Sequence, residues 1–297
     1  MSFVATANSI CMTGAKPVFV DVEKETGLID PNLIERAITK KTVAIMPVHL
    51  YGQMVDMKKI LAIAKKYNIN VVEDAAHALE SKRDGMRPGE KSFGACFSFY
   101  ATKSITSGEG GAFATNSQET AKLIKKLRSH GITSELAQRM RTGLRTYDVD
   151  IFGWKYNMDN IQASLLLPQL KKAEKVWKKR DAIAKQYQEA FADLPLVIPK
   201  DIKNAKHGRH MFVIWVDPEK RDAMLNYIIK KGVGAVINYP AIHLFTYYRE
   251  TFGFKPGMFP NAEEIANRTI TLPLYAKLKK DEVKYIIDTV KRAVTTI

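Results

Sequence analysis

The stretch Cys96–Ala112, CFSFYATKSITSGEGGA, gives the strongest indication of the fold of this chain. Its first five residues, Cys96 to Tyr100, predict a strand with apolar cover on both faces, because they are aromatic or small. Lys103 follows where such a strand leaves an open α/β sheet, the place where these sheets bind ligands. Partial desolvation there lowers the pKa of a lysine and leaves more free amine to attack a carbonyl. The glycines at 108, 110 and 111 permit positive φ or a close approach to a ligand.

A second stretch, Asn70–Ala78 (NVVEDAAHA), predicts a short apolar strand that ends in Glu73 and Asp74. Asp74 lies 29 positions before Lys103, which leaves room for one excursion and one return strand to the same sheet edge. An enzyme that uses pyridoxal phosphate needs a carboxylate to keep the ring nitrogen protonated, because the cationic ring is the electron sink. Two simpler interpretations remain open: Lys103 as a solvated strand end, and Asp74 as the N-cap of a helix from Ala75.

These two stretches and their neighbours resemble the DegT/StrS-like sugar aminotransferases, a family of fold-type I pyridoxal phosphate enzymes. The resembling segments follow in family order from Ser2 towards the C-terminus. They are SFVATANSI, GAKPVFVDV, MPVHLYGQ, EDAAHA, FSFYATKSITSGEGG, LRSHG, KYNMDNIQAS, NYPAIH and TLPLYAKL. Because nine motifs occur in order, the resemblance is specific.

The expected fold is α/β. Short apolar runs alternate with helical patterns, which favours a mainly parallel sheet flanked by helices. The resemblance implies the fold-type I architecture, with a cofactor-binding large domain over residues 1–179 and a smaller C-terminal α+β domain over residues 180–297. The family's first helix, first strand and phosphate-cupping Gly-Thr or Gly-Ser turn would precede Met1, so we expect an N-terminally shortened large domain with weaker cofactor retention.

Individual elements follow from local signals. Asp56 is expected to cap a helix that ends near Tyr67, and a long helix is expected from Asp159, kinked by Pro168. Strands are expected at Lys16–Val22 and Val233–Asn238. The region 132–152 has no periodicity and is expected to be a long functional loop.

The resemblance implies a role for each matching residue near the cofactor. Lys103 corresponds to the lysine that forms the Schiff base with pyridoxal 5'-phosphate and carries the proton, and Asp74 to the partner of the ring nitrogen. His77 corresponds to a residue at the ring face or phenolic oxygen, Ser98 to a phosphate ligand, and Phe3 to an aromatic stacked on the ring. The alternatives are a structural histidine, a hydroxyl bonded to a neighbour, and simple core packing.

Four further residues correspond to substrate or subunit contacts. Asn157 matches an asparagine that reaches the phosphate in the other subunit, which implies a homodimer with shared active sites; the alternative is a cap for the helix from Asp159. Lys155 beside it reinforces anion binding. In NYPAIH, His243 and Tyr239 match residues facing the sugar substrate.

Composition limits the other classes. The 46 Lys and Arg against 31 Asp and Glu give a net charge of +15, but the lysines fall in pairs on amphipathic helices without a nucleic-acid motif. No apolar run is long enough for a membrane span, and no signal peptide is indicated, so a cytoplasmic protein is expected. Cys11 and Cys96 lack metal-ligand spacing and predict reduced, buried thiols; no metal site is expected.

The sequence therefore predicts a pyridoxal phosphate-dependent aminotransferase that converts a nucleotide-linked keto-sugar to an amino sugar. Glutamate is the implied amino donor, and cell-surface polysaccharide or related sugar biosynthesis is the implied setting. The family's dehydratases lack the lysine, so Lys103 favours transamination. The alternative is a non-catalytic truncated remnant or a regulatory binding protein, which rests on the absent phosphate turn and the high positive charge.

Overall fold

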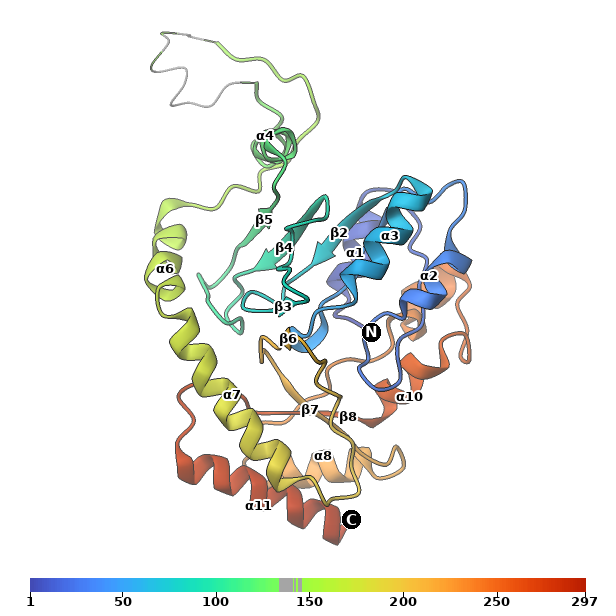
Figure 1. Cartoon of the computed structure of the whole chain (residues 1–297), viewed down its shortest axis with the longest axis vertical. Coiled ribbons are helices and arrows are strands. Elements are labelled where there is room, and N and C mark those ends of the chain that lie inside the picture. The colour runs from blue at the N-terminus through green and yellow to red at the C-terminus, as the bar shows by residue number, and fades with distance from the viewer. Residues whose placement is uncertain (134–140, 142, 144–145) are drawn as a thin grey trace.

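The computed structural model describes residues 1–133, 141, 143 and 146–297. It shows a mixed α/β fold in which a central sheet lies at one level and a small two-stranded sheet at another (Figure 1). The long helix α7 (Ala173–Ala190) runs from the level of the central sheet to the C-terminal helices.

The central sheet has the strand order β1-β2-β4-β5. The strands are β1 (Ala44–Ile45), β2 (Asn70–Asp74), β4 (Gly94–Ser98) and β5 (Gly111–Ala114). The first three are parallel, and β5 runs antiparallel to β4. The prediction of a mainly parallel sheet is therefore confirmed. The register sets Asp74 beside Cys96, so the end of β2 and the exit of β4 share one edge of the sheet.

Helices α1 (Ala5–Met12), α2 (Pro31–Ala37) and α3 (Met57–Tyr67) belong to this half of the chain. The predicted cap of α3 is confirmed, since the Asp56 carboxylate accepts the Lys59 backbone N–H at 3.1 Å. Asparagine at 68 ends the helix in the left-handed conformation. The apolar face of α3 packs into a core that draws mainly on the first third of the chain. That core contains Leu28, Ile34, Ile45, Leu50, Tyr51, Met54, Val55, Met57, Ile60, Ala64, Val71, Val213 and Tyr239.

The predicted kink in the long helix is a break. Asp159 caps α6 (Asn160–Leu170) by accepting the Gln162 N–H at 2.8 Å. Pro168 lies in the last turn of α6 and leaves the Ser164 carbonyl without its helical N–H partner. The helix ends two residues later, before α7 begins at Ala173. Helix α4 (Gln118–Leu127) lies at the end of the molecule beyond β5 (Figure 1).

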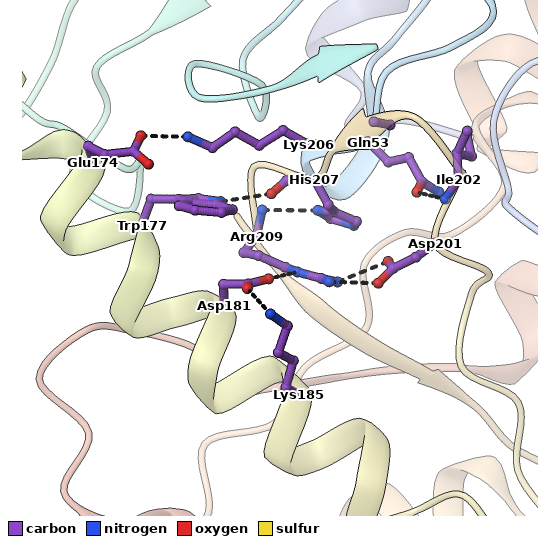
Figure 2. A pocket seen from close by; sticks show the side chains of 11 residues that line it. Gln53, Glu174, Trp177, Asp181, Lys185, Asp201, Ile202, Lys206, His207 and Arg209 are labelled. Carbon is purple, nitrogen blue, oxygen red and sulfur yellow. Dashed lines mark hydrogen bonds and ion pairs between the residues drawn. The ribbon is translucent and has the colours of Figure 1, made fainter. Parts of the chain in front are cut away.

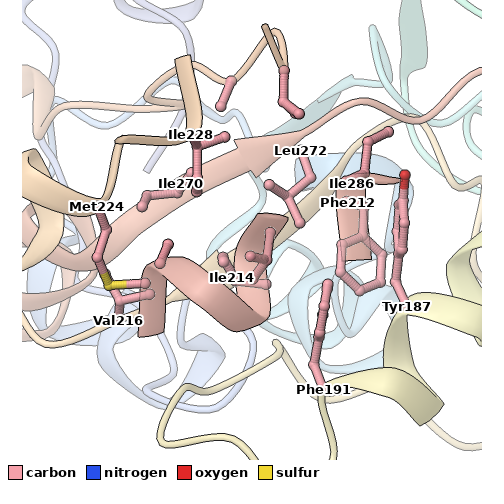
Figure 3. Packing of buried hydrophobic residues seen from close by; sticks show 14 of the residues in the cluster. Tyr187, Phe191, Phe212, Ile214, Val216, Met224, Ile228, Ile270, Leu272 and Ile286 are labelled. Carbon is pink, nitrogen blue, oxygen red and sulfur yellow. The ribbon is translucent and has the colours of Figure 1, made fainter. Parts of the chain in front are cut away.

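The C-terminal core forms around the antiparallel strands β7 (Phe212–Trp215) and β8 (Thr269–Leu272), in which every residue is buried. Helices α7, α8 (Arg221–Lys230) and α11 (Lys280–Thr296) pack around this pair, and Figure 3 shows their side chains interdigitating. The remaining elements are β3 (Lys82–Arg83), β6 (Ala205–Lys206), α9 (Thr246–Phe252), α10 (Pro260–Arg268) and the short 3-10 helices η1 (Leu50–Gly52) and η2 (Ile242–Leu244).

Two predicted strands are wrong. Lys16–Val22 and Val233–Asn238 are extended, but each joins another segment by a single bridge, Val22 to Ile29 and Val236 to Thr271. Both stretches have strand-like composition, yet among the described residues neither has a neighbour that continues the ladder. Much of the expected loop 132–152 lies outside the described residues. The division between residues 179 and 180 falls within the unbroken α7 and stays a prediction.

The two cysteines are unpaired, and the predicted burial of both thiols is wrong. Cys11 is half-buried and Cys96 is exposed. Cys96 projects from β4 on a face that the described residues leave open, although Ala95 on the other face is completely buried. The expected cover on both faces of this strand is therefore present on one face only.

Candidate active site

Lys103 lies in the loop that follows β4. The loop closes on itself, because the Phe99 backbone donates to Gly110 at 2.8 Å and accepts from Ser107 at 3.0 Å. The amine of Lys103 is half-buried, and this burial lowers its pKa below the ordinary value for a lysine, while the charge of Asp74 acts in the opposite direction. The two predicted residues therefore lie within electrostatic reach of each other, as expected from the register of β2 and β4.

Two glycines allow this loop its path. Gly110 has φ +135°, and a Cβ there would overlap the methyl group of Met158. A Cβ at Gly111 would lie 2.8 Å from the Phe97 carbonyl oxygen. Positive φ and close approach were both expected here, and larger residues would push the loop away from α6 and β4.

Asp74 is held at both carboxylate oxygens. Oδ1 accepts the Ala76 backbone N–H at 3.0 Å, and Oδ2 accepts the Thr6 hydroxyl at 2.6 Å. No helix follows Asp74, since residues 75–78 form a turn closed by the Ala78 N–H and the Ala75 carbonyl. The helix-cap alternative is therefore wrong. A turn cap leaves carboxylate lone pairs for a further donor.

His77 is buried between two rings. It stacks on His210 at a centroid distance of 4.5 Å and lies parallel to Tyr239 at 6.0 Å. Its Nδ1 accepts the Tyr51 N–H at 3.3 Å, and its Nε2 lies 3.2 Å from the Tyr239 hydroxyl. Burial, followed by the charge of Lys103, lowers the pKa of His77 to about 3, so the ring is neutral.

This arrangement fixes the direction of the hydrogen bond. Since Nδ1 of neutral His77 accepts, the proton lies on Nε2 and is donated to the oxygen of Tyr239. Burial and the charge of Asp74 raise the pKa of Tyr239, which keeps its own proton. The Tyr239 hydroxyl can therefore donate to a ligand.

Ser98 is the last residue of β4, and Phe3 lies beside Tyr239. The Ser98 hydroxyl accepts the Tyr100 backbone N–H at 3.3 Å, which leaves its proton available to a phosphate oxygen. Phe3 is 56% exposed, and its ring centroid lies 5.9 Å from that of Tyr239. Core packing does not explain so exposed a ring, so that alternative is wrong for Phe3.

Asn157 and Lys155 are both exposed and lie in the segment before α6. Asp159, two positions after Asn157, supplies the N-cap of α6, so the alternative role of Asn157 as that cap is wrong. Lys155 joins Ser129 in a single antiparallel bridge. The structure does not connect either side chain to Lys103 within one chain.

His243 lies in a different environment. Its side chain is buried beside Phe259, and its Nε2 lies 2.9 Å from the Glu263 carboxylate. His243 lies within η2 and packs with Phe259 and Glu263 rather than with the residues around Lys103. Its assignment as a substrate contact stays a prediction.

Several buried polar residues lie behind the site, and the sequence analysis assigned none of them a role in the chemistry. His49 lies against Glu73 at 2.6 Å with both side chains inaccessible. Burial alone would raise the pKa of Glu73, but hydrogen bonds from His49, the Ser92 hydroxyl and the Gly89 backbone lower it overall. Burial also lowers the pKa of His210 well below its ordinary value. The only sequence signal was a polar residue beside each apolar run.

A cavity with a volume of about 480 Å³ lies elsewhere among the described residues (Figure 2). Trp177 and Asp181 of α7 form one wall, and Arg209 binds both Asp181 and Asp201. Lys206 covers the Trp177 ring at 3.9 Å. Because the charged side chains of the lining pair with one another, this cavity offers a ligand little free charge.

The residues around Lys103 fit pyridoxal phosphate better. They offer an amine of lowered pKa, a carboxylate with lone pairs left, a hydroxyl at Ser98 and an open sheet face at Cys96 beside Asp74. Over the residues that the structure describes, no cluster of acidic, histidine and cysteine side chains could hold a metal ion. Over the same residues, no helix has the length and hydropathy of a membrane span.

Comparison with known proteins agrees with this chemistry. SpsC, the spore coat polysaccharide biosynthesis protein of Bacillus subtilis, is 38% identical over 98% of this chain and 77% of its own length. A putative sugar aminotransferase of Streptococcus pneumoniae, in its pyridoxamine phosphate form, superposes with a TM-score of 0.93 at 31% identity, covering 100% of this chain and 80% of that one. PseC of Helicobacter pylori, an aminotransferase of pseudoaminic acid biosynthesis, gives 0.92 at 30% identity, covering 100% and 78%.

The family model for the DegT/DnrJ/EryC1/StrS aminotransferases matches residues 1–291. The predicted fold, the aminotransferase class and the pyridoxal phosphate cofactor are thereby confirmed at the level of the family. With nearly its whole length matched and a chemically suitable lysine and carboxylate at one sheet edge, the chain belongs to the DegT/DnrJ/EryC1/StrS aminotransferase family.

Proposed function

We propose that this protein transfers an amino group from glutamate to a nucleotide-linked keto-sugar, as a step of cell-surface polysaccharide or related sugar biosynthesis. The names of SpsC and PseC, which refer to spore coat polysaccharide and pseudoaminic acid biosynthesis, support this substrate class. The observation that carries the proposal is the half-buried Lys103 amine of lowered pKa within electrostatic reach of Asp74.

Lys103 and Asp74 have complementary tasks. When bound, pyridoxal phosphate supplies an electron sink at its ring. We assign two tasks to Lys103 Nζ: it would hold the cofactor and, as a free amine, it would carry the proton during transfer. We assign Asp74 to accept a hydrogen bond from the ring nitrogen, a task for which a carboxylate with lone pairs left is suited.

Neighbouring side chains orient the cofactor in this proposal. Ser98 donates its free hydroxyl proton to the phosphate, and Phe3 stacks on the ring. His77 holds the Tyr239 hydroxyl so that the tyrosine proton is presented to substrate or cofactor oxygen, which supports Tyr239 as a substrate contact. We retain Lys155 and His243 as further substrate contacts on the strength of the motifs alone.

We further propose a homodimer in which Asn157 reaches the phosphate of the other subunit's cofactor. The exposed apolar side chains next to it support this assembly. Ile161 is 78% and Leu167 64% exposed on α6, and the rings of Trp154 and Tyr156 stack nearby at 6.0 Å. A group of exposed large apolar side chains near one segment favours a protein contact, and a second copy would cover them.

We also propose a cytoplasmic location. The two unpaired cysteines, one of them exposed, support it, because an exposed free thiol persists best in a reducing compartment.

Borohydride reduction of the cofactor-loaded protein, followed by peptide mapping, tests the lysine. We expect the pyridoxyl group on Lys103, and a label on another lysine with Lys103 unmodified would refute the assignment.

Incubation with glutamate and a panel of nucleotide-linked keto-sugars tests the reaction. We expect 2-oxoglutarate and an amino sugar in equal amounts, measured by mass spectrometry, and release of neither would refute the proposed reaction.

A further inference from the structure

Thr6, at the start of α1, touches the carboxylate proposed to face the cofactor. Its hydroxyl donates to Asp74 Oδ2 at 2.6 Å, across 68 positions of sequence. The contact joins α1 to the end of β2. Thr6 itself is half-buried.

A second hydroxyl stands behind the first. The Ser2 and Thr6 oxygens lie 2.6 Å apart, and Ser2 is 6% exposed. Since Thr6 uses its only proton on Asp74, Ser2 is the donor in the bond between them. The protons therefore point in one direction, from Ser2 to Thr6 to Asp74.

This relay of hydrogen bonds, from Ser2 through Thr6, sets the orientation of the Asp74 carboxylate. An ionised carboxylate is free to rotate about its Cβ–Cγ bond unless both oxygens are held. The Ala76 backbone N–H holds Oδ1, and Thr6 holds Oδ2. The remaining lone pairs consequently have fixed directions, and a hydrogen bond to a charged group is stronger than one between neutral groups.

We propose that Thr6, supported by Ser2, is a positioning residue that orients Asp74 towards the ring nitrogen of pyridoxal phosphate. The inference rests on the proposed function, because it needs Asp74 to meet that nitrogen. It concerns two residues that lie 68 and 72 positions before Asp74 in the sequence. A purely structural anchor for α1 is the competing explanation.

The test compares Thr6→Val, which keeps the shape and removes the hydroxyl, with Thr6→Ser, which keeps the hydroxyl. The dissociation constant for pyridoxal phosphate and the pH titration of the bound cofactor's absorption are measured. We expect Thr6→Val to bind about tenfold more weakly and Thr6→Ser to stay within about twofold of the parent, as loss of one charge-assisted hydrogen bond implies. Ser2→Ala should have a smaller effect of the same sign.

The matched control is Thr13→Val. Thr13 ends the same helix. Its exposed hydroxyl donates to the Ile10 carbonyl at 2.7 Å and accepts the Ala15 N–H at 3.4 Å, so its loss should leave cofactor binding unchanged. Thermal unfolding of the cofactor-free variants tests whether Thr6 only anchors α1. An anchoring role would lower the melting temperature without changing the pH titration of the bound cofactor.

A double-mutant cycle shows whether Thr6 acts through Asp74. In an Asp74→Ala background, Thr6→Val should change the dissociation constant by less than about twofold. An equal loss in both backgrounds, or parent-like binding and titration by Thr6→Val, would overturn the inference while leaving the proposed function intact. Absence of pyridoxal phosphate binding by the parent protein would overturn both. If Thr6→Val does not fold, parent-like binding by Ser2→Ala and a loss in Thr6→Ser would count against the relay.

Discussion

The strand pairs β4–β5 and β7–β8 are both antiparallel, yet they are covered differently. Every residue of β7 and β8 is buried, whereas β4 exposes Cys96 and β5 exposes Gly111, Ala112 and Ala114. Packing alone accounts for the residues of the first pair. The second pair keeps one face open among the described residues, which is where we propose that a ligand and a second subunit approach.

The buried polar groups follow the same division. The threonines 269, 271 and 289 are the buried polar residues around β8 and α11, whereas His49, Glu73 and His77 lie behind the edge of the central sheet. Burial of ionisable groups costs free energy unless they are bonded. The C-terminal core thus serves stability, and the sheet edge holds the groups that we propose for the chemistry, at some cost to stability.

Asp74→Asn should give the largest effect on turnover. It alters the proposed site at the edge of the central sheet and leaves the C-terminal core unchanged. A neutral amide cannot hold the ring proton, so turnover should fall about a hundredfold or more while Lys103 still captures the cofactor. Single-turnover kinetics and borohydride labelling measure the two quantities. Asp30→Asn, which alters a carboxylate that caps α2, is the control and should keep parent turnover. Near-parent turnover in Asp74→Asn would reduce Asp74 to a turn cap.

Ile214→Ala tests the other region, the C-terminal core. Ile214 is fully buried in β7, so the cavity and the lost transfer free energy should lower the free energy of unfolding by about 2–5 kcal/mol. The affinity of the folded protein for pyridoxal phosphate should be unchanged. Denaturant titration and cofactor titration give the two values. A large loss of affinity in the folded variant would show that the two regions are not independent. Val18→Ala, at an exposed valine, is the control for stability.

Mixing two inactive variants tests whether Asn157 contributes to the site of a second subunit. If Asn157 serves the other subunit's cofactor, Lys103→Ala and Asn157→Ala subunits should complement each other when mixed and re-associated. One site of each heterodimer then has both residues, so random pairing should restore about a quarter of parent activity. Absence of recovery, in a mixture shown to exchange subunits, would place Asn157 in its own subunit's site.

The smallest effect concerns the Lys103 amine in the cofactor-free protein. Burial lowers the pKa of Lys103, and the negative charge of Asp74 partly opposes this by favouring the protonated amine. Asp74→Asn removes that opposition, so the pKa of Lys103 should fall further and its labelling by an amine-reactive reagent should persist to lower pH. A midpoint that moved to higher pH would contradict the electrostatic contact. Lys91, exposed before β4, provides an internal control for the reagent.

Local rules predicted the parts of the fold that local contacts determine. Asp56 and Asp159 cap helices as expected, and Pro168 interrupts one. Helix α1 was missed because only Ala7 among its residues is buried, which leaves no apolar periodicity to detect. The extended stretch Lys16–Val22 failed as a strand because pairing depends on a distant partner.

The candidate site shows the same limit. Lys103, Asp74, His77, Ser98 and Tyr239 were predicted, since each follows or precedes an apolar run or matches a family motif. The Thr6 contact with Asp74 spans 68 positions, and His210 meets His77 across more than a hundred, so no local pattern contained them.

The close contact between η1 and the segment before β7 has a consequence for mutational surveys. The Gly208 N–H donates to the Gly52 carbonyl at 2.7 Å, and a Cβ at Gly208 would lie 2.6 Å from the Ser81 hydroxyl. A Cβ at Gly52 would meet the Arg209 backbone nitrogen at 3.0 Å. The same Cβ at Gly52 would lie 3.1 Å from both the His210 backbone nitrogen and the His77 carbonyl oxygen, so a side chain there would press on both histidine segments. A saturation library scored by turnover alone would therefore rank Gly52 and Gly208 as highly as Lys103, the proposed catalytic lysine, although neither glycine has a side chain that could react.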